Sequence, residues 1–71
     1  MDTMTLTLDS RIDLNVLDNY VIASGVKLTY MQEDFNSVTI DVAGDAEDLD
    51  YFEEEILQYE SQVIAEEESY D

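Results

Sequence analysis

The sequence predicts a small α+β domain with the element order β-α-β-β-α, in which a three-stranded antiparallel sheet carries two helices on one face. Residues 3–8 and 37–42 alternate polar with apolar side chains, the period of a strand with one buried face. The last third of the chain instead repeats apolar residues at spacings of three and four, the period of a helix. A right-handed crossover that leaves room for the third strand between the first two gives the strand order 1-3-2.

Length and composition indicate one domain spanning residues 1–71. A chain of 71 residues is near the lower limit for independent folding, and its 45% hydrophobic content is enough for one small core. It contains no Cys and no His, which excludes disulfides and thiolate metal sites and removes the commonest general base and metal ligand. We therefore expect no catalytic residue, no metal site and no cofactor.

Membrane insertion and export are not expected either. No apolar run approaches the roughly 18 residues that a membrane-spanning helix requires. The opening stretch, MDTMTLTLD, lacks the basic region that begins a secretory signal. These two observations favour a cytoplasmic protein.

A helix is expected from Arg11 to Ser24, after the strand at residues 3–8. Asp9 or Ser10 would cap its start, with Asp13 as the acidic partner of a capping box. Gly25 would end it, because glycine readily adopts the left-handed conformation that closes a helix.

The apolar residues of this segment allow two interpretations. As a helix, it has one buried face with two flanking residues: Leu14, Leu17 and Val21, flanked by Tyr20 and Ile22. Residues 12–16 also alternate apolar with polar side chains, so a strand at that point is an open alternative to the helix.

Two strands follow at residues 26–31 and 37–42, joined by a polar turn at residues 32–36. Apolar residues at alternate positions of the second of these strands would share its buried face: Val38, Ile40 and Val42. Gly44 or Asp45 would then cap the last helix. In topology the arrangement resembles a ferredoxin-like split βαβ unit that lacks its last strand.

The last helix has an apolar stripe and a carboxylate face. The stripe consists of Leu49, Phe52, Ile56, Tyr59 and Val63. At 100° per residue these side chains fall within about 80° of one another. The acids project from the far side of the helix and from both flanks. Beyond Ala65 the apolar period fades, so the acidic tail at residues 66–71 is expected to fray.

Charge is the most unusual property of the chain. Its 19 acids against Arg11 and Lys27 give a net charge of −17. Residues 1–44 carry 7 acids and both bases, whereas residues 45–71 carry 12 acids and no base. Such a field repels nucleic acid and anionic membranes and attracts basic surfaces. Two cations cannot neutralise a useful number of phosphates, so direct nucleic-acid binding is not expected.

Catalysis by carboxylates and a dedicated metal site are both disfavoured. Paired carboxylates need a cleft to act as acid and base, and a domain of this size offers little cleft. The acids from Asp41 to Asp50 invite comparison with a calcium-binding loop, D-x-[DN]-x-[DN]-G-x5-E, but Gly44 precedes most of them. Loose association of Ca²⁺ or Mg²⁺ with the acids is the most that this pattern predicts.

Tyr51 lies among the carboxylates on the far side of the helix, where its ring has no role in the core. Tyrosines beside acids suit an interface with an arginine-rich partner, through stacking and cation–π contact. An ordinary exposed tyrosine is the equal alternative.

The spacing of the acids approximates the spacing of phosphates. Acids one turn apart on a helix stand about 5–6 Å from each other, and a helix of some 20 residues is roughly 30 Å long. Because duplex DNA carries one charge per about 1.7 Å of its axis, such a rod approximates the charge of about one duplex turn.

The chain resembles the small acidic DNA-mimic inhibitor proteins of bacteriophages. The resemblance lies in its size, its charge, its lack of Cys and His, and its acidic helix with interspersed aromatic residues. The resemblance implies a non-catalytic, anti-defence type of protein in the cytoplasm of a host cell. Its partner would be a basic nucleic-acid-binding protein of restriction, CRISPR, repair or transcription.

The surface expected to bind this partner consists of acids and one tyrosine from the last third of the chain: Asp45, Glu47, Asp48, Asp50, Tyr51, Glu53, Glu54, Glu55 and Glu60. Glu33, Asp34 and Asp41 would extend it. Asp2 and Asp9 are expected to lie far from it.

Two alternatives remain open at this point. An acidic antitoxin or adaptor would bind one basic protein by shape as well as charge, and an exposed apolar flank at Leu57 and Ile64 would suit that role or a homodimer. A halophile-type acidic protein would carry its acids more evenly. Like-charged neighbours such as Asp50 and Glu54 each cost a few tenths of a kcal/mol, about what such pairs cost on exposed helices, which favours a function for them.

Overall fold

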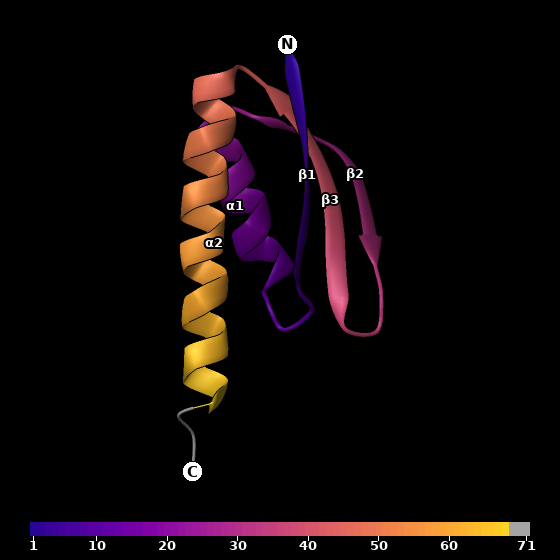
Figure 1. Ribbon diagram of the computed structural model, residues 1–71, viewed down its shortest axis with the longest axis vertical. Helices are drawn as coiled ribbons and strands as arrows, with labels where there is room; N and C mark the ends of the chain where they lie inside the picture. The colour runs from indigo at the N-terminus through magenta and orange to yellow at the C-terminus, as the bar shows by residue number, and fades with distance from the viewer. Residues whose placement is uncertain (69–71) are drawn as a thin grey trace.

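The computed structural model describes the backbone of residues 1–68 and the side chains of residues 1–66. Its elements are β1 (Asp2–Asp9), α1 (Leu14–Ser24), β2 (Lys27–Glu33), β3 (Ser37–Gly44) and α2 (Ala46–Glu68). The predicted order β-α-β-β-α is confirmed, and the structure resolves the alternative at residues 12–16 in favour of the helix (Figure 1).

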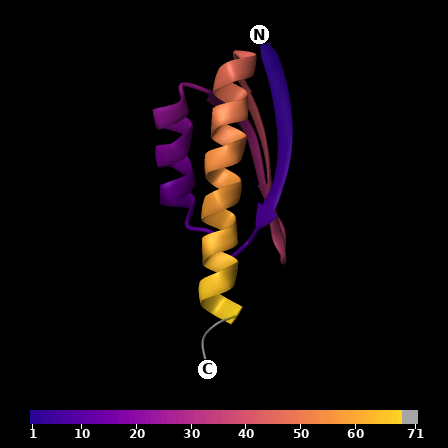
Figure 2. The same ribbon diagram turned by 60° about the vertical axis from the view of Figure 1, so that its left-hand side comes forward.

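β3 lies in the middle of the sheet and is antiparallel to both of its neighbours, so the predicted strand order 1-3-2 is confirmed. Ile40 pairs with Leu6 on one side and with Met31 on the other. Figure 2 shows both helices on the same side of the sheet. The opposite face of the sheet carries no helix of the described chain.

The core forms between the sheet and the two helices, because each element turns its apolar positions inward. The largest fully buried side chains come from the sheet and from both helices: Leu8, Ile40 and Val42 from the sheet, Leu17 from α1, and Phe52 and Ile56 from α2. Val38, Ile40 and Val42 are all buried, as their alternation predicts. Removing a buried phenylalanine such as Phe52 costs about 3–5 kcal/mol in cores of this kind.

The predicted start of α1 is wrong. The helix begins at Leu14, and its N-cap is Asp13, whose carboxylate accepts a 2.8 Å hydrogen bond from the backbone N–H of Asn15. Asp9 cannot serve as the cap because its carboxylate is held by Arg11, through the backbone N–H at 2.8 Å and the guanidinium at 2.9 Å. The chain turns there and buries Ile12 before the helix begins.

The end of α1 is where the sequence predicts it. Gly25 has a φ of 78°, and its N–H donates to the carbonyl of Ile22 at 3.2 Å. The buried face of α1 includes Leu17 and Val21, whereas the flanking Ile22 is 70% exposed.

β2 is displaced along the chain relative to the prediction, since it runs from Lys27 to Glu33 instead of over residues 26–31. Pairing with β3 extends it, because Gln32 meets Thr39 and Glu33 meets Val38. The connecting turn is therefore shorter than expected and is closed by a 2.7 Å bond from the N–H of Asp34 to the carbonyl of Ser37.

α2 extends past the end of the sheet (Figure 1). Asp45 precedes it, and the Asp45 carbonyl accepts the N–H of Leu49 at 2.9 Å, as a residue at the N-cap does. Of the predicted stripe, Leu49, Phe52 and Ile56 are buried. The helix continues through Glu68, past the position where fraying was expected to begin, and residues 69–71 lie outside the described residues.

Candidate functional site

The acids from Asp45, which precedes α2, to Glu55 lie on the solvent side of the helix. Asp45, Glu47, Asp50 and Glu54 are exposed, and Asp48, Glu53 and Glu55 are partly exposed. They lie there because Leu49, Phe52 and Ile56 occupy the face that packs on the sheet. At 3.6 residues per turn, the intervening positions must face outward.

Tyr51 lies among these acids and is 53% exposed, so its ring is accessible to a partner. No Lys or Arg occurs anywhere in α2. We call the seven acids from Asp45 to Glu55 the acidic surface: Asp45, Glu47, Asp48, Asp50, Glu53, Glu54 and Glu55.

Glu60, which the sequence also assigned to the partner-binding residues, lies beyond these seven acids and hydrogen-bonds another element. It is partly buried, and its carboxylate accepts a 2.6 Å hydrogen bond from the backbone N–H of Asp9 at the end of β1. The neighbouring Tyr59 acts in the same way, since its hydroxyl accepts a 3.0 Å bond from the N–H of Asp13. The Tyr59 ring also packs against Tyr20 of α1, with centroids 5.8 Å apart. Tyr59 and Glu60 thus hold the loop between β1 and α1.

The side of α2 that faces solvent is acidic in its first half and uncharged in the stretch that follows. Past the acidic surface, the outward side of the helix presents Leu57, Gln58, Ser61 and Gln62, which are exposed and uncharged. The acidic surface is therefore about 15 Å long at 1.5 Å per residue, which is roughly half a duplex turn of about 34 Å. The rod of a full turn that the sequence suggested is interrupted at this uncharged stretch.

The proposed extensions of the surface do not adjoin α2. Ile40 and Val42 face the helices, so Asp41 between them faces the open side of the sheet, where it accepts a 2.6 Å bond from the Thr5 hydroxyl. Glu33 and Asp34 lie at the end of β2 and in the following turn, both exposed.

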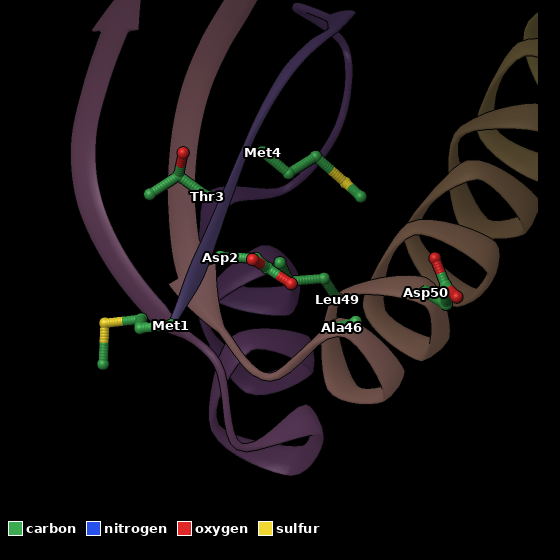
Figure 3. Close-up of a pocket in the computed structure, with 7 residues that line it drawn as sticks. All are labelled: Met1, Asp2, Thr3, Met4, Ala46, Leu49 and Asp50. Carbon is green, nitrogen blue, oxygen red and sulfur yellow. The ribbon is translucent and has the colours of Figure 1, made fainter.

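Asp2 was expected to lie far from the acidic surface but lies beside it. An open hollow of about 510 Å³ separates the start of β1 from the start of α2 (Figure 3). Its lining comes from both elements: Met1, Asp2, Thr3, Met4, Ala46, Leu49 and Asp50. Asp2 and Asp50 are 48 positions apart in the chain numbering, so no local pattern could have indicated this approach.

Asp9 does lie away from the acidic surface, at the opposite end of β1. The Arg11 guanidinium and the Arg11 backbone N–H hydrogen-bond its carboxylate and lower the pKa of Asp9 from 3.8 to about 2. The same end of the molecule carries Phe35, which is 95% exposed in the turn between β2 and β3. A lone aromatic residue in a polar turn carries no periodic signal, so no pattern in the sequence indicates the exposure of Phe35.

The described residues hold no group of three or more His, Cys, Asp or Glu side chains arranged to bind a metal ion. None of the helices in that part of the chain is long and apolar enough to cross a membrane. Exposed carboxylates without a catalytic partner can attract cations and cationic side chains, and this is the chemistry that the acidic surface offers.

No protein-family model, curated protein or solved structure matches this chain. The surface chemistry of the described residues is therefore the basis for a functional proposal.

Proposed function

We propose that this protein is a non-catalytic inhibitor that occupies the basic nucleic-acid-binding surface of a host protein, with the carboxylates of α2 taking the place of DNA phosphates. The observation that carries the proposal is the concentration of seven exposed or partly exposed carboxylates, one just before α2 and six in its first half, on a helix that contains no base. A surface that is acidic only to remain soluble has no reason to gather its charge on one rod.

The charge density of the acidic surface approaches that of a duplex. Duplex DNA carries one charge per about 1.7 Å, so about 15 Å of axis corresponds to roughly nine phosphates. The acidic surface offers seven carboxylates over that length. It can therefore satisfy a cluster of Lys and Arg residues that normally holds about half a turn of DNA.

Like charges on this helix are unrelieved within the helix itself. Asp50 and Glu54 are four residues apart and both exposed, an arrangement that costs a few tenths of a kcal/mol, about the size of other i,i+4 pairs. Cations of a bound partner would reduce this repulsion between carboxylates. Relief of the repulsion would therefore contribute to the free energy of binding.

Tyr51 supplies a contact that phosphates lack. Its half-exposed ring lies among the carboxylates, so an arginine drawn to Asp50 or Glu54 would also meet an aromatic face. Such cation–π contacts contribute about 0.5–2 kcal/mol. This contact would let the protein compete with DNA for the same basic residues.

The resemblance to phage DNA mimics points to a restriction, CRISPR, repair or transcription protein as the target class, in the cytoplasm of a host cell. The inhibitor would act by exclusion: bound to the target, it would keep nucleic acid out. It would not itself contact nucleic acid, because the field around α2 repels phosphates.

The test begins with identification of the target, by capture from host lysate at low and at raised salt followed by mass spectrometry. Displacement of labelled DNA from that target is then measured by fluorescence polarisation. The variant Asp48→Asn, Asp50→Asn, Glu54→Gln, Glu55→Gln keeps side-chain size and removes four charges, so it should stay folded and lose the ability to displace DNA. For the parent protein, affinity should fall steeply as salt rises.

A matched control removes four charges elsewhere: Asp18→Asn, Glu33→Gln, Asp34→Asn and Asp41→Asn. These residues lie on α1, on the β2–β3 end and on the open sheet face. The control should compete with DNA nearly as well as the parent. Equal losses in both fourfold variants would show that overall charge, and not the α2 surface, drives binding.

A second candidate is an acidic antitoxin or adaptor that recognises its basic partner by shape. Leu57, which is 38% exposed beside the uncharged Gln58, Ser61 and Gln62, favours it. In that case the fourfold α2 variant would still bind the partner, whereas Leu57→Gln would not.

A further inference from the structure

We infer that the hollow between β1 and α2 receives an arginine side chain of the basic partner. The inference deepens the proposed function, since it names a contact at the end of the same acidic surface. The hollow is open to solvent and has a volume of about 510 Å³, within the range of roughly 300–1,000 Å³ that is usual for small-molecule sites. Figure 3 shows β1 on one side of it and the first turns of α2 on the other.

Apolar side chains from both elements line part of the hollow. Leu49 has 3% of its surface exposed, Met4 is partly buried, and Ala46 is the first residue of α2. Figure 3 shows Met4 extended from β1 toward α2. The aliphatic stem of an arginine packs favourably on such a surface while its charged end remains near water. The flexible thioether of Met4 can adapt to it.

The walls of the hollow each carry one carboxylate. Asp2 comes from β1 and is directed toward α2, and Asp50 comes from the second turn of α2 (Figure 3). Both are exposed at the rim. A planar guanidinium has five N–H donors and can contact carboxylates on two sides at once. The compact ammonium of a lysine offers no such fork, so the site favours arginine.

The start of a helix normally favours anions, which opposes this assignment. The effect of the helix dipole amounts to about half a positive charge near Ala46. Met1 also lines the hollow, and its α-ammonium adds a full positive charge there. Against these two stand the full negative charges of Asp2 and Asp50 at the hollow, with Asp45, Glu47 and Asp48 close by in the chain. The five carboxylates outnumber the positive charges, so the hollow attracts a cation.

N-acetyl-L-arginine methylamide is a suitable probe, because it presents the side chain without the partner. It would be titrated into the ¹⁵N-labelled full chain and followed by NMR, in parallel with N-acetyl-L-lysine methylamide. We expect the amide signals of Met4, Ala46, Leu49 and Asp50 to move most, and the arginine probe to saturate at a lower concentration than the lysine probe. Shifts spread evenly along the acids of residues 45–55 would overturn the inference.

Two variants distinguish binding of the probe in the hollow from its general attraction to the acidic surface. Ala46→Leu fills the hollow without changing the charge and should abolish the localised shifts. Asp2→Asn removes the charge of one wall and should weaken probe binding by about 1.4- to fivefold, the range expected for an exposed ion pair. Asp45→Asn removes the same charge next to the hollow but not from its lining, and should have a smaller effect. Parent-like titrations of Ala46→Leu and Asp2→Asn would overturn the inference, provided that their NMR spectra remain dispersed.

The probe experiment does not depend on the target protein, so the inference and the proposed function can fail separately. If Asp2→Asn and Ala46→Leu displace DNA from the target as well as the parent does, while the fourfold α2 variant does not, the arginine site is wrong and the mimicry stands. If the probe occupies the hollow and the parent displaces no DNA, the arginine site stands and the mimicry is wrong.

Discussion

The carboxylate of Glu60 accepts a 2.6 Å hydrogen bond from the backbone N–H of Asp9, which lies 51 positions earlier in the chain. This bond ties the middle of α2 to the last residue of β1. A neighbouring bond from the N–H of Asp13 to the Tyr59 hydroxyl, at 3.0 Å, ties the start of α1 to the same turn of α2. Glu60, one of the nine residues expected to meet a partner, thus also joins two elements of the fold.

Replacing Glu60 by Ala should destabilise the protein, whereas replacing Glu54 by Ala should not. The first change leaves the partly buried N–H of Asp9 without its acceptor, which costs about 1–3 kcal/mol. Glu54 is exposed on the acidic surface, so its loss should change stability by no more than about 0.5 kcal/mol. Urea unfolding of both variants measures the difference. Equal stabilities would show that the Glu60 bond contributes nothing.

Phe52→Ala should leave the protein largely unfolded at room temperature. The side chain is fully buried, and its removal costs about 3–5 kcal/mol, a large part of the stability available to a domain of this size. Tyr51→Ala is the matched control, because it truncates an adjacent aromatic residue that is 53% exposed. Circular-dichroism melting curves compare them. A Phe52→Ala variant that melts like the control would contradict the assignment of the buried face.

Tyr51 should matter for partner binding through its ring and not through its hydroxyl. Loss of a cation–π contact worth about 0.5–2 kcal/mol weakens affinity by about two- to thirtyfold, so Tyr51→Ala should bind the captured target more weakly. Tyr51→Phe keeps the ring and should bind nearly as the parent does. Surface plasmon resonance on the captured target provides the measurement. Indistinguishable affinities for the parent and Tyr51→Ala would leave Tyr51 as an ordinary exposed residue.

The Asp9–Arg11 pair should make stability depend on pH in acid. Arg11 lowers the pKa of Asp9 to about 2 in the folded protein, against about 3.9 in an unfolded chain. The folded state therefore binds fewer protons, and the stabilisation is fully present above about pH 4 and is lost as pH falls through 2.

Comparison of the parent with Asp9→Asn isolates this contribution. The stability difference between the two should be constant above about pH 4 and should shrink between pH 4 and pH 2. Arg11→Met removes the guanidinium and should reproduce the same trend. Chemical denaturation at half-unit steps of pH would measure it, and a difference that stays constant down to pH 2 would disprove the ion-pair contribution.

Local patterns in the sequence determined the elements of this protein and the faces that they bury. Val38, Ile40 and Val42 alternate, Leu49, Phe52 and Ile56 recur at helical spacing, and all six are buried. The stop at Gly25 was equally local, since a left-handed glycine ends a helix wherever it occurs. Such features depend on residues a few positions apart, and a single sequence contains all of them.

The polar contacts between elements were decided only by the tertiary structure. The spacing of Asp9 and Ser10 suited a helix cap, but the carboxylate of Asp9 bonds Arg11, and the cap is Asp13. A helical wheel places Glu60 on a flank and cannot show that the N–H of Asp9 lies 2.6 Å from its carboxylate. Asp2 meets the rim of the acidic surface only because β1 runs beside α2. Periodicity determines which face of an element is apolar, but the hydrogen-bond partner of a polar side chain depends on which other element packs beside it.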